Sequence, residues 1–460
     1  MPEEHLQKRI GLLQATAINM IDMVGIGPFV VLSAVATEMN GGWFLWAWIA
    51  GALLSLVDAC IWSELGAAYP LAGGSYNFLK VGYGPKWGKL MSFLLVWQTM
   101  IQAPLVITSA SLGFAKYFAF IVPLNEIESK AVSGGLVVMI MVLLYRKIET
   151  IGKISVLLWV GVLATIAIVI VAGVMHGNFI QPLTQMNEGG DFSFAALAAL
   201  GTASVSTVYS YLGYYNVCHL GGEIINPQRN IPRSMFISIA GIAILYLLMN
   251  ISVASVLPMD AIKKSNFVVS EFIHVLAGPG AATAVTVLIL WVAFASIFSA
   301  TLGYSRIPYA AAKDGAFFSV FAKLHPTKNF PYISLLSLGC IAFVFSMFFT
   351  SVASVVKAIL AMRILVQFIG QAIGLLLLHK ARRHQHFPWR MPLFPIPVIV
   401  AILIWIGIFY STKELMLYGL GVITAGIIVY FIKAYISKDW PFYNAKSEEA
   451  QVEQLFSNNP

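Results

Sequence analysis

The sequence has 460 residues, of which 59% are hydrophobic and only 10% charged, with a formal net charge of +8. Soluble domains are about one quarter charged, so this composition excludes a water-exposed fold and makes lipid the main solvent. The positive charge does not indicate nucleic acid binding, because the basic residues are spread among short loops without an aromatic-interleaved stripe. Long continuous apolar runs pair their backbone amides in lipid as helices, which predicts an all-α membrane protein.

Apolar runs of about 20 residues predict about twelve transmembrane helices, with no soluble domain between them. They lie near residues 12–37, 43–68, 88–121, 131–146, 154–175, 193–220, 235–257, 280–306, 332–350, 353–379, 393–411 and 414–436. Residues 1–11 form a short N-terminal segment, residues 393–437 hold the last two helices, and residues 438–460 form a tail. The three cysteines, Cys60, Cys218 and Cys340, lie in apolar segments and are expected to be core residues without disulfides.

The basic residues also predict an orientation. If the N-terminus is cytoplasmic, most of the 28 Lys and Arg residues fall on the cytoplasmic side, as the positive-inside rule requires. We therefore expect a multi-pass plasma membrane protein with both termini in the cytoplasm. Short loops and the absence of a targeting segment favour a bacterial inner membrane.

Two of the predicted spans contain residues that interrupt a helix at mid-depth. The first holds Gly25, Gly27 and Pro28, and the sixth holds a tyrosine-rich stretch around Gly213. One such kink alone would favour simple packing, but unwound backbone within a membrane is tolerated only where it lines an enclosed cavity. The matched pair predicts an inverted repeat of two five-helix units, residues 12–176 and 192–380, with a binding site between them.

Four motifs in order along most of the chain resemble those of the amino acid, polyamine and organocation (APC) superfamily, in particular its L-type amino acid transporter-like branch. They are residues 25–29 (GIGPF), 63–76 (SELGAAYPLAGGSY), 222–233 (GEIINPQRNIPR) and 305–315 (SRIPYAAAKDG). Each motif alone is weak, and their order makes the resemblance specific. It implies a LeuT-like fold of five plus five helices, with the eleventh and twelfth helices outside the core.

The resemblance also implies a substrate held between the two breaks. Free amides of Ile26 and Gly27, at the start of a half-helix, suit a carboxylate, although Ile26 replaces the family's usual Ser and Pro28 removes a donor. Carbonyls of the sixth span suit an ammonium group. The aromatic lid position of the family is occupied by Tyr209. The predicted substrate-binding residues are Gly25, Ile26, Gly27, Tyr209, Ser210, Leu212, Gly213, Tyr214 and Ser296.

Ionisable residues inside a membrane are costly and indicate function. Asp22 is predicted to meet an ammonium group, carry a proton or neutralise Arg363, and the candidate partners of Arg363 are Asp22, Asp58 or an acidic group of the substrate. A gating network is predicted near the inner face from Glu64, Glu223, Arg306 and Asp314, with a solvated loop as the alternative. The predicted gating or coupling residues are Asp22, Tyr209, Glu64, Glu223, Arg306 and Arg363.

These patterns predict a secondary active transporter that carries amino acids by alternating access, as an exchanger, a uniporter or a proton symporter. A polyamine or other organic cation carrier of the same fold is the alternative, because Asp22 and the tyrosines suit an amine without a carboxylate. No metal-ligand spacing or catalytic set is present, so neither an enzyme nor a cofactor is expected. Residues 123–130, after the third span, lack the cysteine by which related carriers pair with a glycoprotein. No disulfide-linked subunit is therefore expected, and a monomer and a homodimer both remain open.

Overall fold

The computed structural model describes residues 6–39, 43–184, 193–381, 387–413 and 415–442. All regular secondary structure in these residues is helical. The first half contains α1 (Leu12–Met23), α2 (Gly27–Glu38), α3 (Phe44–Ala68), α4 (Ser75–Gly82), α5 (Gly84–Ile121), α6 (Glu126–Leu144), α7 (Ile148–His176) and α8 (Gln181–Thr184). The second half contains α9 (Phe194–Tyr211), α10 (Asn216–His219), α11 (Pro227–Ala254), α12 (Met259–Lys264), α13 (Val268–Tyr304), α14 (Arg306–Lys313), α15 (Tyr332–Phe348), α16 (Val352–Arg363), α17 (Gln371–Ala381), α18 (Ile396–Ser411) and α19 (Leu415–Ser437).

Within these residues, eight helices are long and apolar enough to cross a membrane, or nine if α1 and α2 form one span bent by 44°. Two shorter apolar helices, α15 and α18, accompany them. An all-helical membrane fold is thereby confirmed, whereas the number twelve and the inverted repeat stay predictions. The predicted sixth span is divided into α9 and α10 by a non-helical stretch at residues 212–215.

Several helices begin earlier than the apolar windows predicted. The structure starts α5 at Gly84 rather than at residue 88, and α7 at Ile148 rather than at 154. Polar residues at these ends continue the helical backbone, which a hydropathy window cannot register. For α13 the difference has another cause, because Gly278 adopts φ 79° and joins a short helix to the long one that was predicted from residue 280.

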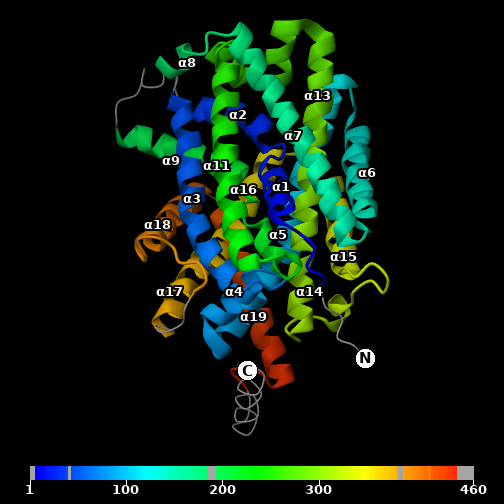
Figure 1. The fold of residues 1–460 in the computed structure, drawn as a ribbon, viewed down its shortest axis with the longest axis vertical. Coiled ribbons are helices and arrows are strands. Elements are labelled where there is room, and N and C mark those ends of the chain that lie inside the picture. The colour runs from blue at the N-terminus through cyan, green and yellow to red at the C-terminus, as the bar shows by residue number, and fades with distance from the viewer. Residues whose placement is uncertain (1–5, 40–42, 185–192, 382–386, 414, 443–460) are drawn as a thin grey trace.

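Both helix breaks lie inside the bundle, where residues 24–26 and 212–215 are all buried. Figure 1 shows α1 and α16 near its centre, surrounded by α3, α7, α11 and α13, with α6 and α15 on one flank and α17 and α18 on the other. The packing of α3 against α11 and of α5 against α13 encloses the centre. The largest fully buried side chains include Trp48, Trp62, Trp405, Tyr211 and Tyr246.

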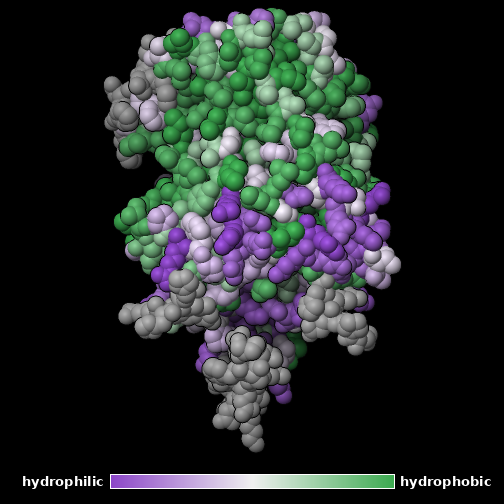
Figure 2. Space-filling view, in the orientation of Figure 1, coloured by the Kyte–Doolittle hydropathy of each residue, from purple (hydrophilic) through white to green (hydrophobic). Residues whose placement is uncertain are grey.

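The two ends of the molecule differ in polarity. Hydrophobic side chains cover the upper part of the surface in Figure 2, and hydrophilic side chains gather toward the lower end. The N- and C-terminal parts of the chain, α4 and α14 all lie at that lower end in Figure 1. One end of the bundle therefore carries the first and last described residues and the polar loops, and residues 1–5 and 443–460 lie outside the described residues.

Candidate functional site

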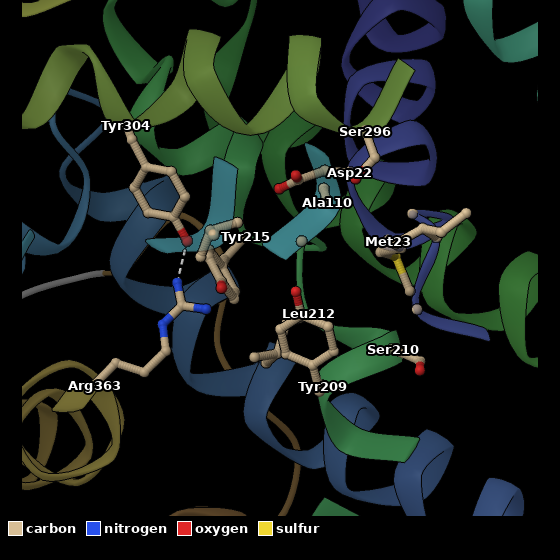
Figure 3. Close-up of a pocket in the computed structure, with 15 residues that line it drawn as sticks. Asp22, Met23, Ala110, Tyr209, Ser210, Leu212, Tyr215, Ser296, Tyr304 and Arg363 are labelled. Atoms are coloured by element: carbon tan, nitrogen blue, oxygen red, sulfur yellow. Dashed lines mark hydrogen bonds between the residues drawn. The ribbon is translucent and has the colours of Figure 1, made fainter. Parts of the chain in front are cut away.

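A small cavity lies where the two breaks meet (Figure 3). Its volume is about 40 Å³, and a water molecule needs roughly 10–15 Å³ on the same measure. Its walls come from α1, α2, α5, α9, α13, α16 and the segments between α1 and α2 and between α9 and α10. The lining residues are Asp22, Met23, Gly25, Ile26, Gly27, Val106, Ala110, Tyr209, Ser210, Leu212, Gly213, Tyr215, Ser296, Tyr304 and Arg363.

The break between α1 and α2 presents backbone to this cavity. The amide of Gly25 donates to Met23 O (2.9 Å), so the helical hydrogen-bond pattern ends there, and α2 begins at Gly27 with Pro28 in its second position. The first amides of a helix have no intrahelical acceptor, so the start of α2 carries a partial positive charge. Gly25 is needed here because a Cβ atom at this position would lie 2.7 Å from Ser296 Oγ.

The break between α9 and α10 faces the break between α1 and α2 across the cavity. Gly213 adopts φ 126°, a conformation that L-residues avoid, and its Cα packs so closely on α1 that a Cβ atom would lie 2.7 Å from the carbonyl carbon of Asp22. Two buried polar side chains connect the breaks. The hydroxyl of Tyr246 lies 2.8 Å from Met23 O and 3.1 Å from Ser210 O, and Val217 N donates to the side chain of Asn19 (2.9 Å).

The carbonyls expected to receive an ammonium group are partly engaged. Tyr209 O accepts the amide of Leu212 (3.2 Å), and Ser210 O accepts the hydroxyl of Tyr246. A carbonyl oxygen has two lone pairs, so each can still accept one more hydrogen bond.

Tyr209 and Ser296 lie at the cavity as predicted, on opposite walls. The ring of Tyr209 lines the cavity from the end of α9, and its hydroxyl is hydrogen-bonded to Ser109 Oγ of α5 (2.8 Å). This bond attaches the ring to a neighbouring helix. Ser296 lies on α13 opposite Gly25.

Arg363 and Asp22 place a guanidinium and a carboxyl group on the cavity wall, and Figure 3 shows them approaching from different helices. Arg363 is 1% exposed, and its guanidinium donates to the hydroxyl of Tyr304 and to Gln367 Oε1. Among the described residues, neither Arg363 nor Asp22 forms an ion pair. Asp58, a predicted partner of Arg363, instead accepts hydrogen bonds from Trp62, Trp405 and Tyr214.

Tyr214 is the one predicted binding residue that does not line the cavity. Its side chain turns away to Asp58, and the adjacent Tyr215 lines the cavity instead. The cavity is also lined by four residues that no sequence pattern predicted, Met23, Val106, Ala110 and Tyr304. A signal existed for Tyr304, which follows Ser296 by eight residues on α13 and so lies on the same face of that helix.

The residues predicted to form a gating network make separate pairs at the polar end. Arg306 and Glu223 form a buried ion pair, with Nε 3.0 Å and Nη2 3.2 Å from the two carboxylate oxygens. Burial raises the pKa of Glu223, and the Arg306 guanidinium opposes that shift.

The other two acidic residues have different partners. The carboxylate of Glu64 accepts His379 Nε2 (2.6 Å) and Met391 N (3.0 Å). Asp314 pairs with Lys80 (2.6 Å) near the surface. Three distinct polar contacts therefore connect helices and loops at the polar end of the bundle.

Apolar flanks and two broken helices that meet at a small enclosed cavity are typical of membrane transport proteins. This chain belongs to the amino acid permease family of the APC superfamily, whose model matches residues 10–433. The chain is 27% identical to the serine/threonine exchanger SteT of Bacillus subtilis (strain 168), over 93% of this chain and 97% of that protein. It is 27% identical to the human cystine/glutamate transporter (85% and 77%) and 24% identical to the mouse Asc-type amino acid transporter 1 (94% and 82%).

Proposed function

We propose that this protein is a secondary active transporter that moves amino acids across the plasma membrane by alternating access. The observation that supports it best is the cavity between the two breaks, where the start of α2 and the end of α9 offer amides and carbonyls to one small ligand. An α-amino acid carries a carboxylate and an ammonium group on one carbon, so it complements both helix ends at once. The named relatives, which are amino acid transporters, support the same class of substrate.

A polyamine is the weaker candidate because of Arg363. A guanidinium that lines the cavity without a paired carboxylate repels a polycation and attracts a carboxylate. Asp22 on the same wall offers one site for an ammonium group. This combination of charges fits a zwitterion better than a ligand with only positive charges.

In the transport cycle that we propose, the two ends of the cavity open one at a time. Tyr209, attached to Ser109, closes the cavity on one side, and the pairs formed by Glu223 with Arg306 and by Glu64 with His379 close the polar end. Opening one end breaks the contacts at that end, while the contacts at the other end persist. The five-plus-five inverted repeat, residues 12–176 and 192–380, is part of this proposal.

The polar end faces the cytoplasm in this proposal, because it carries the basic loops and the first and last described segments. A bacterial relative that spans nearly the whole chain agrees with a bacterial inner membrane. Residues 123–130 contain no cysteine, and the protein is proposed to work without a disulfide-linked subunit, as a monomer or a homodimer.

Ligand binding by the purified protein tests the proposal. A thermal-shift screen against the twenty amino acids and several diamines should show stabilisation by an amino acid, because a ligand that binds only the folded state raises its Tm. Stabilisation by diamines alone would replace the amino acid proposal with the polyamine alternative.

Uptake of the best ligand into proteoliposomes then identifies the mode of transport. Dependence on unlabelled ligand inside the vesicles indicates an exchanger, and dependence on a pH gradient indicates a proton symporter. Uptake that needs neither indicates a uniporter. Absence of uptake under all three conditions would contradict a transport function.

A further inference from the structure

Asp58 is a fully buried carboxylate in the middle of α3, 1% exposed and outside the cavity. Its Oδ2 atom accepts Trp62 Nε1 (2.8 Å) and the hydroxyl of Tyr214, and its Oδ1 atom accepts Trp405 Nε1 (3.0 Å). Among the described residues it forms no ion pair. The three donors come from α3, from the segment between α9 and α10, and from α18.

The chemistry of these donors requires a carboxylate. An indole N–H can donate but never accept, and the two tryptophans approach different oxygen atoms of Asp58. Asparagine would offer one oxygen, and its amide N–H groups would oppose the other indole. A charged acceptor also forms shorter and stronger hydrogen bonds than a neutral one. Asp58 is therefore the residue type that satisfies all three donors together.

Two pairs of stacked aromatic rings connect Asp58 to Arg363 on the cavity wall. Trp62 stacks on Tyr215, with ring centroids 4.5 Å apart and planes 20° apart, and Trp405 stacks on Phe368, at 4.0 Å and 14°. Tyr215 and Phe368 both lie against the guanidinium of Arg363, whose Cζ is 5.6 and 5.8 Å from the two ring centroids. Four rings thus form a continuous aromatic platform between Asp58 and Arg363.

We propose that Asp58 is a positioning residue for the substrate cavity. Through Trp62 and Trp405 it fixes the aromatic platform that supports Arg363, and through Tyr214 it fixes the backbone that places Tyr215 on the cavity wall. The proposal rests on the proposed function, in which this cavity binds the substrate. It also gives α18, which supplies Trp405, a part in substrate binding without any contact with the substrate.

The first experiment compares Asp58→Asn with the wild-type protein in proteoliposome uptake of the amino acid identified by the thermal-shift screen. The substitution leaves one indole N–H without an acceptor, so the platform shifts and the KM rises about tenfold or more, with a smaller change in kcat. Trp97→Phe is the matched control, because Trp97 Nε1 donates to Val422 O (3.0 Å) between α5 and α19, away from the platform. That variant loses one indole hydrogen bond and should keep the wild-type KM.

Two further variants separate positioning from folding. Trp405→Phe keeps a ring to stack on Phe368 and removes only the N–H donor, so its KM rises in the same direction and by a smaller factor. In the double variant of Asp58→Asn with Arg363→Lys, the KM should be no higher than with Arg363→Lys alone, since residues that act through one another are not additive.

The outcomes distinguish the proposal from its rivals. A wild-type KM in both Asp58→Asn and Trp405→Phe, or additive effects with Arg363→Lys, would overturn it. A lost dependence on a pH gradient at unchanged KM would make Asp58 a proton carrier and also overturn it. If the wild-type protein takes up no amino acid, the proposed function itself fails, which is a separate result.

Discussion

The close approach between Gly25 and Ser296 across the cavity wall gives the sharpest prediction. In Gly25→Ala, the new Cβ atom would lie 2.7 Å from Ser296 Oγ, about 0.7 Å short of the 3.4 Å at which ordinary van der Waals contact begins. The Ser296 hydroxyl must then turn to another rotamer, or the break between α1 and α2 must move away from α13. Overpacking of this kind costs about 1–3 kcal/mol, which corresponds to roughly 5- to 150-fold weaker substrate binding if the closed cavity carries the cost.

Removal of the opposing hydroxyl should restore binding. With Ser296→Ala in the same chain, the nearest side-chain atom to the new methyl group would be the Cβ of residue 296, at 3.3 Å, which is close to ordinary contact. The double variant is therefore expected to recover most of the lost affinity. Gly407→Ala is the matched control, because a Cβ atom at this position on α18 meets nothing within 4 Å.

Substrate Kd from thermal-shift titration and KM from proteoliposome uptake measure these effects. Gly25→Ala should weaken both, Gly407→Ala should change neither, and the double variant should approach the wild-type values. Wild-type affinity in Gly25→Ala, or no recovery on adding Ser296→Ala, would show that the two residues are not in contact in the substrate-bound state.

Two other predictions concern the ends of the cavity. Glu223→Ala leaves Arg306 as an unpaired buried charge and should lower the free energy of unfolding by about 3–5 kcal/mol. Lys80→Ala breaks the more exposed pair with Asp314 and should lower the free energy of unfolding by at most about 1 kcal/mol. Equal Tm values for the two variants would contradict the role of burial. Tyr209→Ala removes the ring over the cavity and should abolish most uptake, while Tyr209→Phe loses only the bond to Ser109 and should stay within about tenfold of wild type. A Tyr209→Phe variant as inactive as Tyr209→Ala would assign the effect to the hydroxyl and not to the ring.

The breaks could be predicted because they depend on local chemistry. Gly25, Gly27 and Pro28 disfavour a continuous helix whatever surrounds them, and Gly213 takes the positive φ that its segment needs in order to turn. The depth of Arg363 within an apolar run was equally visible from the chain alone. These features place the cavity between the same two segments that the sequence indicated.

Side-chain directions in the non-helical segment could not be predicted in the same way. Tyr214 and Tyr215 are neighbours, and their opposite directions follow from the backbone at Gly213 and not from any helical period. The partner of Asp58, Trp405, is 347 positions away and belongs to a helix that the resemblance placed outside the core. Likewise, the pairing of Glu64 with His379 depends on how α3 meets α17.

Residues Ile364–Gly370, directly after Arg363, form a π-helix that joins α16 to α17. A π-helix accommodates more residues per turn than an α-helix, so this stretch holds α16 and α17 in a particular rotation relative to each other. If the same seven residues wound as an ordinary α-helix, α16 would rotate by about 100° and shift by about 1.5 Å against α17, because an α-helix covers the same rotation with one residue fewer. The guanidinium would then leave its aromatic support although no cavity residue had changed, so the position of Arg363 depends on how this stretch is wound as well as on its sequence.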